Sequence, residues 1–420
     1  MKTPAALRAF RHRNFRWFFI GQSGSMIGSW MQQIAVGWLV YRLTGSALLL
    51  GIVGFASNIA FLVVSPVASV FTDRYDRRRL LIAAQGISAI LSMLLATLTF
   101  LHVINAWHIV VIMLGIGVAT SLETPTRHGF LLELVEHREN LPNAIALNAS
   151  LFQMARFIGP ALAGVFLAAF GEAWCFVVNA LTYCWVMAIL LRMRTAARPV
   201  SGPRPDWRRE LRAGFSFVFG AMPLRRLVMV LGATSIFVSS YPMLMPLIAA
   251  QTFGGDSSTF GFLIGAAGVG ALCGSIYLAG RTRVPGLGRF VAAGPLVAGI
   301  GMMLLSVTHA AAMGMACMLL IGFGVIITAA SANTLLQSLA DEDKRGRVVG
   351  IYVMVFLGLQ PIGNLATGAL ADAIGAQHAL LVNGLVAGTV ALWFIAGYGG
   401  WRRAMRPLYE HAGLLEKKPA

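Results

Sequence analysis

The chain is poor in charged residues, and acids are the scarcer kind. Only 12% of its 420 residues are charged, with 16 Asp and Glu against 33 Lys and Arg. A soluble globular protein carries about a quarter charged residues, so a water-soluble fold is excluded. The chain is instead 57% hydrophobic, in repeated apolar runs. Runs of about 20 residues cross the hydrocarbon core of a bilayer as helices, so the sequence predicts an all-α integral membrane protein.

Cysteine is also scarce, and no catalytic signature is present. The four cysteines (Cys175, Cys184, Cys273 and Cys317) lie inside apolar runs without CxxC spacing. This pattern indicates neither a disulfide framework nor a metal site. The chain also contains no Gly-x-x-x-x-Gly-Lys-Ser/Thr or HExxH sequence, the signatures of ATP and zinc-protease sites. We therefore expect neither an enzyme nor a primary pump, and no cofactor or metal.

The net charge of +17 comes from basic residues in the short connections between apolar runs. They form no extended basic face, which argues against a nucleic-acid partner. Basic loops set the topology of a membrane protein and contact anionic lipid. We expect anionic lipid at the cytoplasmic face to be the partner of these residues.

Twelve transmembrane helices with both termini in the cytoplasm fit this charge distribution. In that topology 30 of the 33 Lys and Arg residues are cytoplasmic, Arg42 is external, and Arg127 and Arg156 lie within spans. Turn residues at Gly45, Gly171, Gly254-Gly255 and Gly375 separate spans on the outer side. The predicted spans are 15–40, 47–71, 80–101, 107–132, 143–170, 173–191, 224–250, 257–279, 290–307, 310–339, 348–373 and 378–400.

One long connection divides the spans into two groups of six. We predict an N-terminal six-helix bundle (1–191), a cytoplasmic linker with an interfacial helix (192–223), a C-terminal six-helix bundle (224–402) and a cytoplasmic tail (403–420). The segments ending spans 4 and 10 resemble one another weakly. Internal duplication of this kind is typical of secondary transporters.

The segment 72–79 carries six charges in eight residues, between two apolar runs. Each central Arg or Asp costs about 2.5–3.5 kcal/mol on membrane-insertion scales. The segment is therefore a loop at a membrane face, and its four arginines place it in the cytoplasm.

Three charged residues are predicted well inside the spans, away from their ends. Glu123 and Arg127 lie four residues apart in span 4, near one helical face, and Arg156 lies in the middle of span 5. Glu123 is interpreted as a static ion-pair partner, a proton-coupling acid or a group that recognises substrate charge. Arg156 either pairs with Glu123 or binds an anionic substrate.

Polar and aromatic residues within spans are candidates for a substrate cavity, although each also suits a bond between helices. Their number and mixture favour a large amphipathic solute. Gly21, Gly24 and Gly28 are expected to permit close helix packing. The cavity candidates are Trp30, Gln32, Gln33, Asn58, Asn148, Gln153, Asn179, Asn333, Gln337 and Gln360.

The motifs together resemble the major facilitator superfamily. Residues 69–78 (SVFTDRYDRR) are similar to its Gly-x-Leu-Ala-Asp-Arg-x-Gly-Arg-Arg loop, with Ser69 and Asp76 at the glycine positions. Residues 11–16, 30–41, 125–127, 143–148, 155–160 and 345–347 resemble the enterobactin-exporter-like, drug:proton antiporter branch. The resemblance covers residues 5–400 and says almost nothing about the substrate.

The resemblance implies roles for two motifs. Asp73, Arg74 and Arg77 would form a gate, in which Asp73 pairs with Arg77 and faces the N-terminal end of span 11; Arg78 and Arg79 would serve as anchors. Gly159, Pro160 and Gly164 match the antiporter motif of span 5, with alanine at two other glycine positions. The span-4 arginine of many drug:proton antiporters is absent, since its position falls near Val111.

These observations favour a secondary active transporter that exports an amphipathic small molecule, such as a siderophore or a drug, by alternating access with proton antiport. The alternative is an importer or uncoupled facilitator of a small metabolite on the same fold. The resemblance implies a multi-pass protein of the bacterial cytoplasmic (inner) membrane that functions as a monomer.

Overall fold

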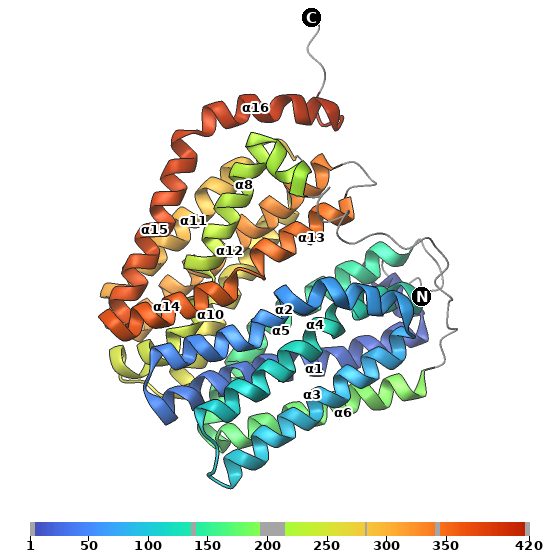
Figure 1. The fold of residues 1–420 in the computed structure, drawn as a ribbon, viewed down its shortest axis with the longest axis vertical. Helices are drawn as coiled ribbons and strands as arrows, with labels where there is room; N and C mark the ends of the chain where they lie inside the picture. Colours follow the sequence, from blue (N-terminus) through green and yellow to red (C-terminus); the bar gives the residue numbers. More distant parts are fainter. Residues whose placement is uncertain (1–4, 136–139, 194–214, 282–283, 341–344, 416–420) are drawn as a thin grey trace, which may run out of the picture. The chain divides into compact units, whose positions relative to one another are not determined.

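The computed structural model describes residues 5–135, 140–193, 215–281, 284–340 and 345–415, and the regular elements in these ranges are all helical (Figure 1). The chain forms two compact units. The first comprises Met1–Gly202 with Gly255–Gly265, and the second comprises Pro203–Gly254 with Ala266–Ala420. Most of the predicted linker helix lies outside the described residues.

The first unit is built from six long helices. Within it α1 packs against α5 and α6, α4 packs against α2 and α3, and α3 packs against α6. A short 3-10 helix, η1 (Ala5–Arg11), precedes them. The helices are α1 (Arg13–Thr44), α2 (Ala47–Arg74), α3 (Arg77–Phe100), α4 (Ala106–Leu134), α5 (Leu141–Phe170) and α6 (Glu172–Arg192).

The second unit contains α11 packed against both α12 and α15, with α14 also against α15. The helix α10 begins among residues grouped with the first unit and continues into the second. The long helices are α8 (Met222–Ala233), α10 (Ser257–Ala279), α11 (Gly288–Val307), α12 (Ala311–Leu339), α13 (Arg345–Phe356), α14 (Gln360–Ile374), α15 (Ala376–Ala396) and α16 (Tyr398–His411).

The predicted turn glycines do end the helices. Gly45 has a φ of 62°, and its N–H donates to the Tyr41 carbonyl at 2.7 Å, which closes the C-terminus of α1. Gly171, Gly254 and Gly375 also have positive φ. Glycine adopts this left-handed conformation without a steric penalty, so the sequence alone was sufficient to locate these boundaries.

Two predicted spans are interrupted, which is a correction to the expectation of continuous helices. In 224–250, α8 is followed by the π-helix η3 (Thr234–Val238), the 3-10 helix η4 (Tyr241–Met243), the short α9 (Met245–Leu247) and the π-helix η5 (Ile248–Thr252). In 348–373, α13 ends at Phe356 and α14 begins at Gln360. Pro242, Pro246 and Pro361 lie at these interruptions, where proline removes a helical hydrogen bond and its ring clashes with the preceding turn.

The predicted C-terminal tail contains a helix. In α16 the side chains of Trp401, Met405 and Tyr409 are buried in the core of the second unit, and the Trp401 indole N–H donates to the Pro223 carbonyl at 2.9 Å. Their four-residue spacing forms one apolar face of a helix, so the sequence already contained a pattern that predicts a helix in this segment.

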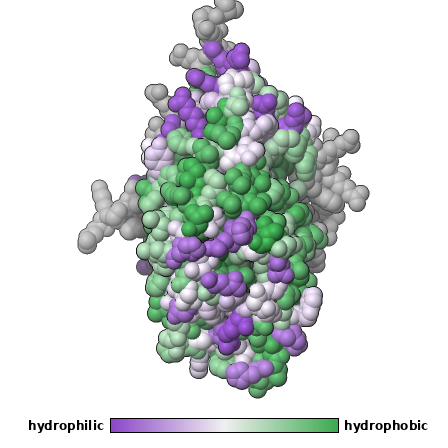
Figure 2. Space-filling model, turned by 90° about the vertical axis from the view of Figure 1, so that its left-hand side faces the viewer, coloured by the Kyte–Doolittle hydropathy of each residue, from purple (hydrophilic) through white to green (hydrophobic). Residues whose placement is uncertain are grey.

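Eleven helical segments in the described part of the chain are long and apolar enough to cross a membrane. The 32-residue α1 does not meet this criterion, and it carries Gln22, Gln32, Gln33 and several serines. Twelve spans and cytoplasmic termini therefore stay predictions. Large apolar side chains are exposed along many of these segments, among them Ile90, Val111 and Val307, and Figure 2 shows broad apolar areas on one face. Such surfaces suit contact with lipid.

Candidate functional site

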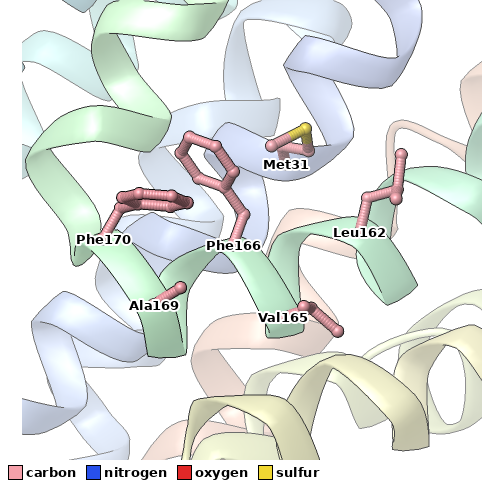
Figure 3. Close-up of a pocket in the computed structure, with 6 residues that line it drawn as sticks. All are labelled: Met31, Leu162, Val165, Phe166, Ala169 and Phe170. Carbon is pink, nitrogen blue, oxygen red and sulfur yellow. The ribbon is translucent and has the colours of Figure 1, made fainter.

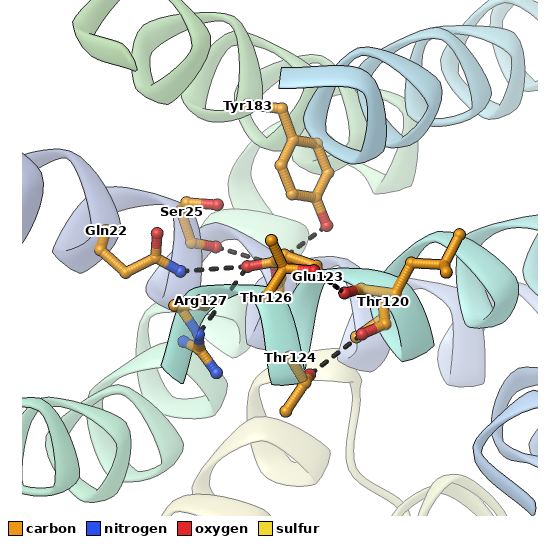
Figure 4. Close-up of polar contacts among 10 residues, drawn as sticks. Gln22, Ser25, Thr120, Glu123, Thr124, Thr126, Arg127 and Tyr183 are labelled. Atoms are coloured by element: carbon orange, nitrogen blue, oxygen red, sulfur yellow. Dashed lines mark hydrogen bonds and ion pairs between the residues drawn. The ribbon is translucent and has the colours of Figure 1, made fainter. Parts of the chain in front are cut away.

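The most distinctive polar cluster lies inside the first unit, around Glu123 (Figure 4). The helix α4 places Arg127 one turn after Glu123, with Arg127 Nε 4.0 Å from Glu123 Oε1. Gln22 of α1 donates from Nε2 to the same carboxylate oxygen at 3.3 Å. The side chains of Glu123 and Arg127 are 14% and 10% exposed. The predicted ion pair is therefore present, and a neutral amide from another helix completes it.

The Glu123–Arg127 pair is loose. A charge-assisted hydrogen bond between these groups would be about 2.7–2.9 Å long, and Arg127 Nε has no hydrogen-bond partner among the described residues. A carboxylate held at this distance keeps part of its acceptor capacity. The pair therefore restrains α4 less tightly than a charge-assisted hydrogen bond would.

A second polar group joins α1 to α6. The Tyr183 and Ser29 hydroxyl oxygens are 3.0 Å apart, and Asn179 donates from Nδ2 to Gln32 Oε1 at 2.8 Å. Asn179 is fully buried and Gln32 is 3% exposed. Two of the cavity candidates therefore bond to each other between helices.

Arg156 does not pair with Glu123, so that alternative is wrong in this structure. Its guanidinium carbon lies 6.0 Å from the centroid of the Trp30 ring, and Trp30 makes an edge-to-face contact with Phe152 at 6.2 Å. Arg156 is half-buried and forms no ion pair with a carboxylate within the described ranges. Three residues from α1 and α5 thus form a mixed cationic and aromatic surface.

Four of the remaining cavity candidates form hydrogen bonds within their own unit. Asn58 donates to the Gly54 carbonyl in its own helix at 3.0 Å, Gln337 donates to Asn333 Oδ1 at 2.9 Å, and Gln360 donates to the Ser239 carbonyl at 3.2 Å. Gln33 is exposed, Asn148 is buried and Gln153 is half-buried. A role in a substrate cavity stays a prediction for all of them.

The cytoplasmic loop is tied to α4 and α6. Arg77 Nη1 forms a 2.8 Å ion pair with Glu133 Oε1. Arg78 donates to the carbonyl oxygens of Leu190 and Leu191 at 2.6 and 2.7 Å, so it caps the C-terminal end of α6 and is more than an anchor.

The Asp76 carboxylate accepts a hydrogen bond from the Arg79 backbone N–H at 3.0 Å and caps the N-terminus of α3. The side chains of Asp73 and Arg74 lie outside the described residues.

Glu133 was missed as a functional candidate. It lies at the end of span 4, where the sequence shows an acid close to a basic loop. That proximity in the chain gives no sign that Arg77, 56 residues earlier, is its partner.

The antiporter-motif glycines sit at close helix contacts. A Cβ on Gly159 would lie 2.5 Å from Trp30 Cβ, so α5 approaches α1 closely. A Cβ on Gly164 would lie 3.0 Å from Gly261 Cα, at the start of α10, within the first unit. Gly21 and Gly28 likewise meet α6 closely, as expected, whereas a Cβ on Gly24 meets nothing within 4 Å. The packing role predicted for Gly24 is wrong.

An apolar hollow of about 210 Å³ lies beside α5, the helix that carries the antiporter motif (Figure 3). Its lining has no polar side chain, so it offers no hydrogen bond or charge to orient a ligand. The lining residues are Met31, Leu162, Val165, Phe166, Ala169 and Phe170.

The second unit contains a buried amide without a partner. Asn364 of α14 is 1% exposed, and neither its Nδ2 nor its Oδ1 has a hydrogen-bond partner among the described residues. The nearby Asn383 of α15, in contrast, donates to Thr367 Oγ1 at 3.0 Å. Buried polar groups usually find partners, so Asn364 is an unusual feature of this unit.

The fold is that of major facilitator transporters. A bacterial homologue of the lysosomal transporter Spinster has a TM-score of 0.72 at 12% identity, covering 98% of this chain and 100% of that chain. A POT family transporter solved with 5-aminolevulinic acid also has a TM-score of 0.72 at 12% identity, covering 93% and 96%. At this identity the likeness establishes the fold alone.

The sequence identifies the family. The transmembrane secretion effector profile matches residues 4–398, and the chain belongs to this family of multi-pass major facilitator transporters. The staphyloferrin A transporter of Staphylococcus aureus is 24% identical, covering 90% of this chain and 96% of its own. The multidrug efflux pump Tap of Mycolicibacterium fortuitum is 25% identical (87% and 92%), and the enterobactin exporter EntS of Shigella boydii is 27% identical (86% and 85%). The chain is therefore a secondary transporter and has no enzymatic role.

Proposed function

We propose that this protein exports an amphipathic small molecule, a siderophore or a drug, in exchange for protons. The observation that carries the proposal is Glu123, an acid inside a predicted span that is held by Gln22 and only loosely by Arg127. A carboxylate in a bilayer changes its proton affinity with solvation and partner distance. Relatives named as siderophore and drug exporters support the export direction.

The mechanism we propose is alternating access of two six-helix bundles. Asp73, Arg74 and Arg77 form the cytoplasmic gate, and the Arg77–Glu133 pair holds the loop against α4. Gly159, Pro160 and Gly164 allow the tight helix contacts on which the movement depends. The polar candidates of each unit and Trp30 are the residues we propose for contact with substrate.

The cellular setting follows from the same proposal. The protein acts as a monomer in the bacterial cytoplasmic (inner) membrane, with anionic lipid at its cytoplasmic face. The exposed arginines of α16 (Arg402, Arg403 and Arg406) suit that contact, because basic residues near a membrane surface are attracted to anionic headgroups.

Transport by inverted vesicles tests the coupling. With enterobactin and staphyloferrin A as probes, a proton gradient with the vesicle interior acid should drive accumulation of at least one of them. Glu123→Gln should abolish gradient-driven accumulation while exchange of the same probe without a gradient continues. Accumulation of none of the probes contradicts proton-driven export of these compounds, and gradient-independent equilibration favours the facilitator alternative.

Glu133→Gln is the matched control, because it removes a carboxylate from the same helix outside the proposed coupling site. It should change the rate of transport, through the Arg77 contact, while accumulation still depends on the gradient. An unchanged pH profile in Glu123→Gln would show that Glu123 is not the coupling acid.

A further inference from the structure

The charged side chains that the structure describes well inside the spans of the first unit do not balance. Glu123 and Arg127 neutralise one another at 4.0 Å, which leaves Arg156 as an additional positive charge in the middle of the apolar segment Asn143–Phe170. An ionised side chain at this depth is costly unless a partner compensates it. Within the described part of the chain no carboxylate supplies that partner.

Among the described residues, the Arg156 guanidinium contacts an aromatic ring and no hydrogen-bond acceptor. Its contact with Trp30 is through the ring face at 6.0 Å, at the outer limit of a cation–π interaction. A guanidinium has five N–H donors in a planar fork that matches a carboxylate. The Trp30 contact uses none of them, so the group retains its capacity to bind an anion.

The aromatic part of this surface is held in place by the backbone. A Cβ on Gly159 would lie 2.5 Å from Trp30 Cβ, so Trp30 is packed directly on α5 one turn after Arg156. Phe152, one turn before Arg156, is 43% exposed and contacts Trp30 edge to face. A flat apolar body can therefore lie against these rings while its charged group reaches Arg156.

We infer that Arg156, Trp30 and Phe152 form a binding site for an organic anion, in which a carboxylate or sulfonate on an aromatic or apolar body pairs with the guanidinium. The inference rests on the proposed function and specifies the charge of its substrate. The site binds an amphipathic cation less tightly than an anion of the same body, since a second positive charge beside Arg156 is repelled. Substrate binding would supply the anionic partner that Arg156 lacks among the described residues.

Equilibrium binding to the full-length protein in lipid nanodiscs tests this site. The probes are 1-naphthoate and 1-naphthamide, which share one ring system and differ in charge. The wild type should bind naphthoate about ten- to a hundredfold more tightly than naphthamide, the range expected for a charge-assisted hydrogen-bonded pair. Arg156→Gln should remove that preference and leave naphthamide binding unchanged.

Two further variants keep the result interpretable. Arg156→Lys retains the charge without the planar fork, so its preference should fall between those of the wild type and Arg156→Gln. Arg16→Gln, a matched loss of an exposed arginine from α1, should leave the preference unchanged. If Arg156→Gln does not assemble, the wild type and Arg156→Lys decide.

Equal affinity of the wild type for the two probes, including no binding of either, overturns the inference. So does a preference for naphthoate that persists in Arg156→Gln. Because the measurement uses no proton gradient, its outcome is separable from the transport test. If the wild type prefers naphthoate but no probe accumulates in the vesicle test, the proposed function is contradicted and the anion-binding site at Arg156 is still supported.

Discussion

At the scale of single residues, the structure distinguishes side chains that hold helices together from those with unused bonding capacity. Asn179, Gln32, Tyr183 and Ser29 have partners on a neighbouring helix. Hydrogen bonds of this kind between membrane helices contribute about 0.6 kcal/mol on average. Arg156 and Asn364 are the opposite case. Among the described residues, Arg156 contacts a ring and the Asn364 amide has no hydrogen-bond partner.

Two asparagines of the second unit make this contrast testable. Asn364→Leu should leave thermal stability unchanged or raise it, because it removes a buried amide that has no partner. Asn383→Leu, the matched variant, should lower stability by about 0.5–1.5 kcal/mol through loss of the bond to Thr367. Thermal unfolding in detergent measures both. A larger loss in Asn364→Leu than in Asn383→Leu would mean that Asn364 is satisfied in the folded protein.

At the scale of helices, close packing depends on a few glycines. A Cβ on Gly261 would lie 2.5 Å from Gly164 Cα and 2.7 Å from the Pro160 carbonyl oxygen, and both are backbone atoms that cannot move independently. The α5–α10 contact in the first unit therefore requires glycine at this position. Gly24 in α1 has open space where its Cβ would be.

Alanine substitutions at these two glycines should have opposite effects. Gly261→Ala should destabilise the protein by about 1–3 kcal/mol, the cost of overpacking. Gly24→Ala should stabilise it by about 0.5–1 kcal/mol, since alanine favours a helix more than glycine does. Thermal unfolding and transport rates check the pair. Equal tolerance of both substitutions would contradict the α5–α10 contact.

The start of α10 gives a pH-dependent prediction. The Asp256 carboxylate accepts hydrogen bonds from the Ser258 hydroxyl and from the backbone N–H groups of Thr259 and Ser258. These bonds, the Ser258 hydroxyl foremost, lower the pKa of Asp256 below its ordinary value of 3.8. The folded-state pKa is the lower one, so the stabilisation is present above about pH 3.8 and is lost as the pH falls through the folded-state pKa.

Asp256→Ala should accordingly lower stability at pH 7 by about 0.5–2 kcal/mol, the usual cost of losing a helix cap. The difference from the wild type should narrow once the pH is well below 3.8. Asp256→Asn keeps a capping oxygen and should be close to the wild type at pH 7. Thermal unfolding at several pH values measures this. A deficit in Asp256→Ala that is constant with pH would assign the effect to something other than the carboxylate.

At the scale of the whole molecule, the distribution of basic residues predicts the orientation in the membrane. Green fluorescent protein fused after Ala420 should fluoresce, because we expect the C-terminus in the cytoplasm. Alkaline phosphatase fused after Gly171, in a predicted outer turn, should be active, and the same enzyme fused after Ala420 should be inactive. Activity of the C-terminal phosphatase fusion would contradict cytoplasmic termini.

The sequence by itself determined the class of protein, the helical segments and most of their ends. Those features depend on local properties: apolar runs long enough for a bilayer, glycines with positive φ, and charges excluded from hydrocarbon. The pairing of Glu123 with Arg127 was also predictable, because residues four apart share a helical face.

Only the tertiary structure decided which distant residues meet. Arg77 pairs with Glu133, Arg78 caps α6, and Arg156 lies over Trp30 instead of pairing with Glu123. These contacts depend on how the helices pack and rotate, which spacing along the chain does not specify. The interruptions near Pro242 and Pro361 were also missed, since Pro125 and Pro160 lie in helices that continue. Proline removes the same hydrogen bond in each case, and the surrounding packing determines whether the helix is broken.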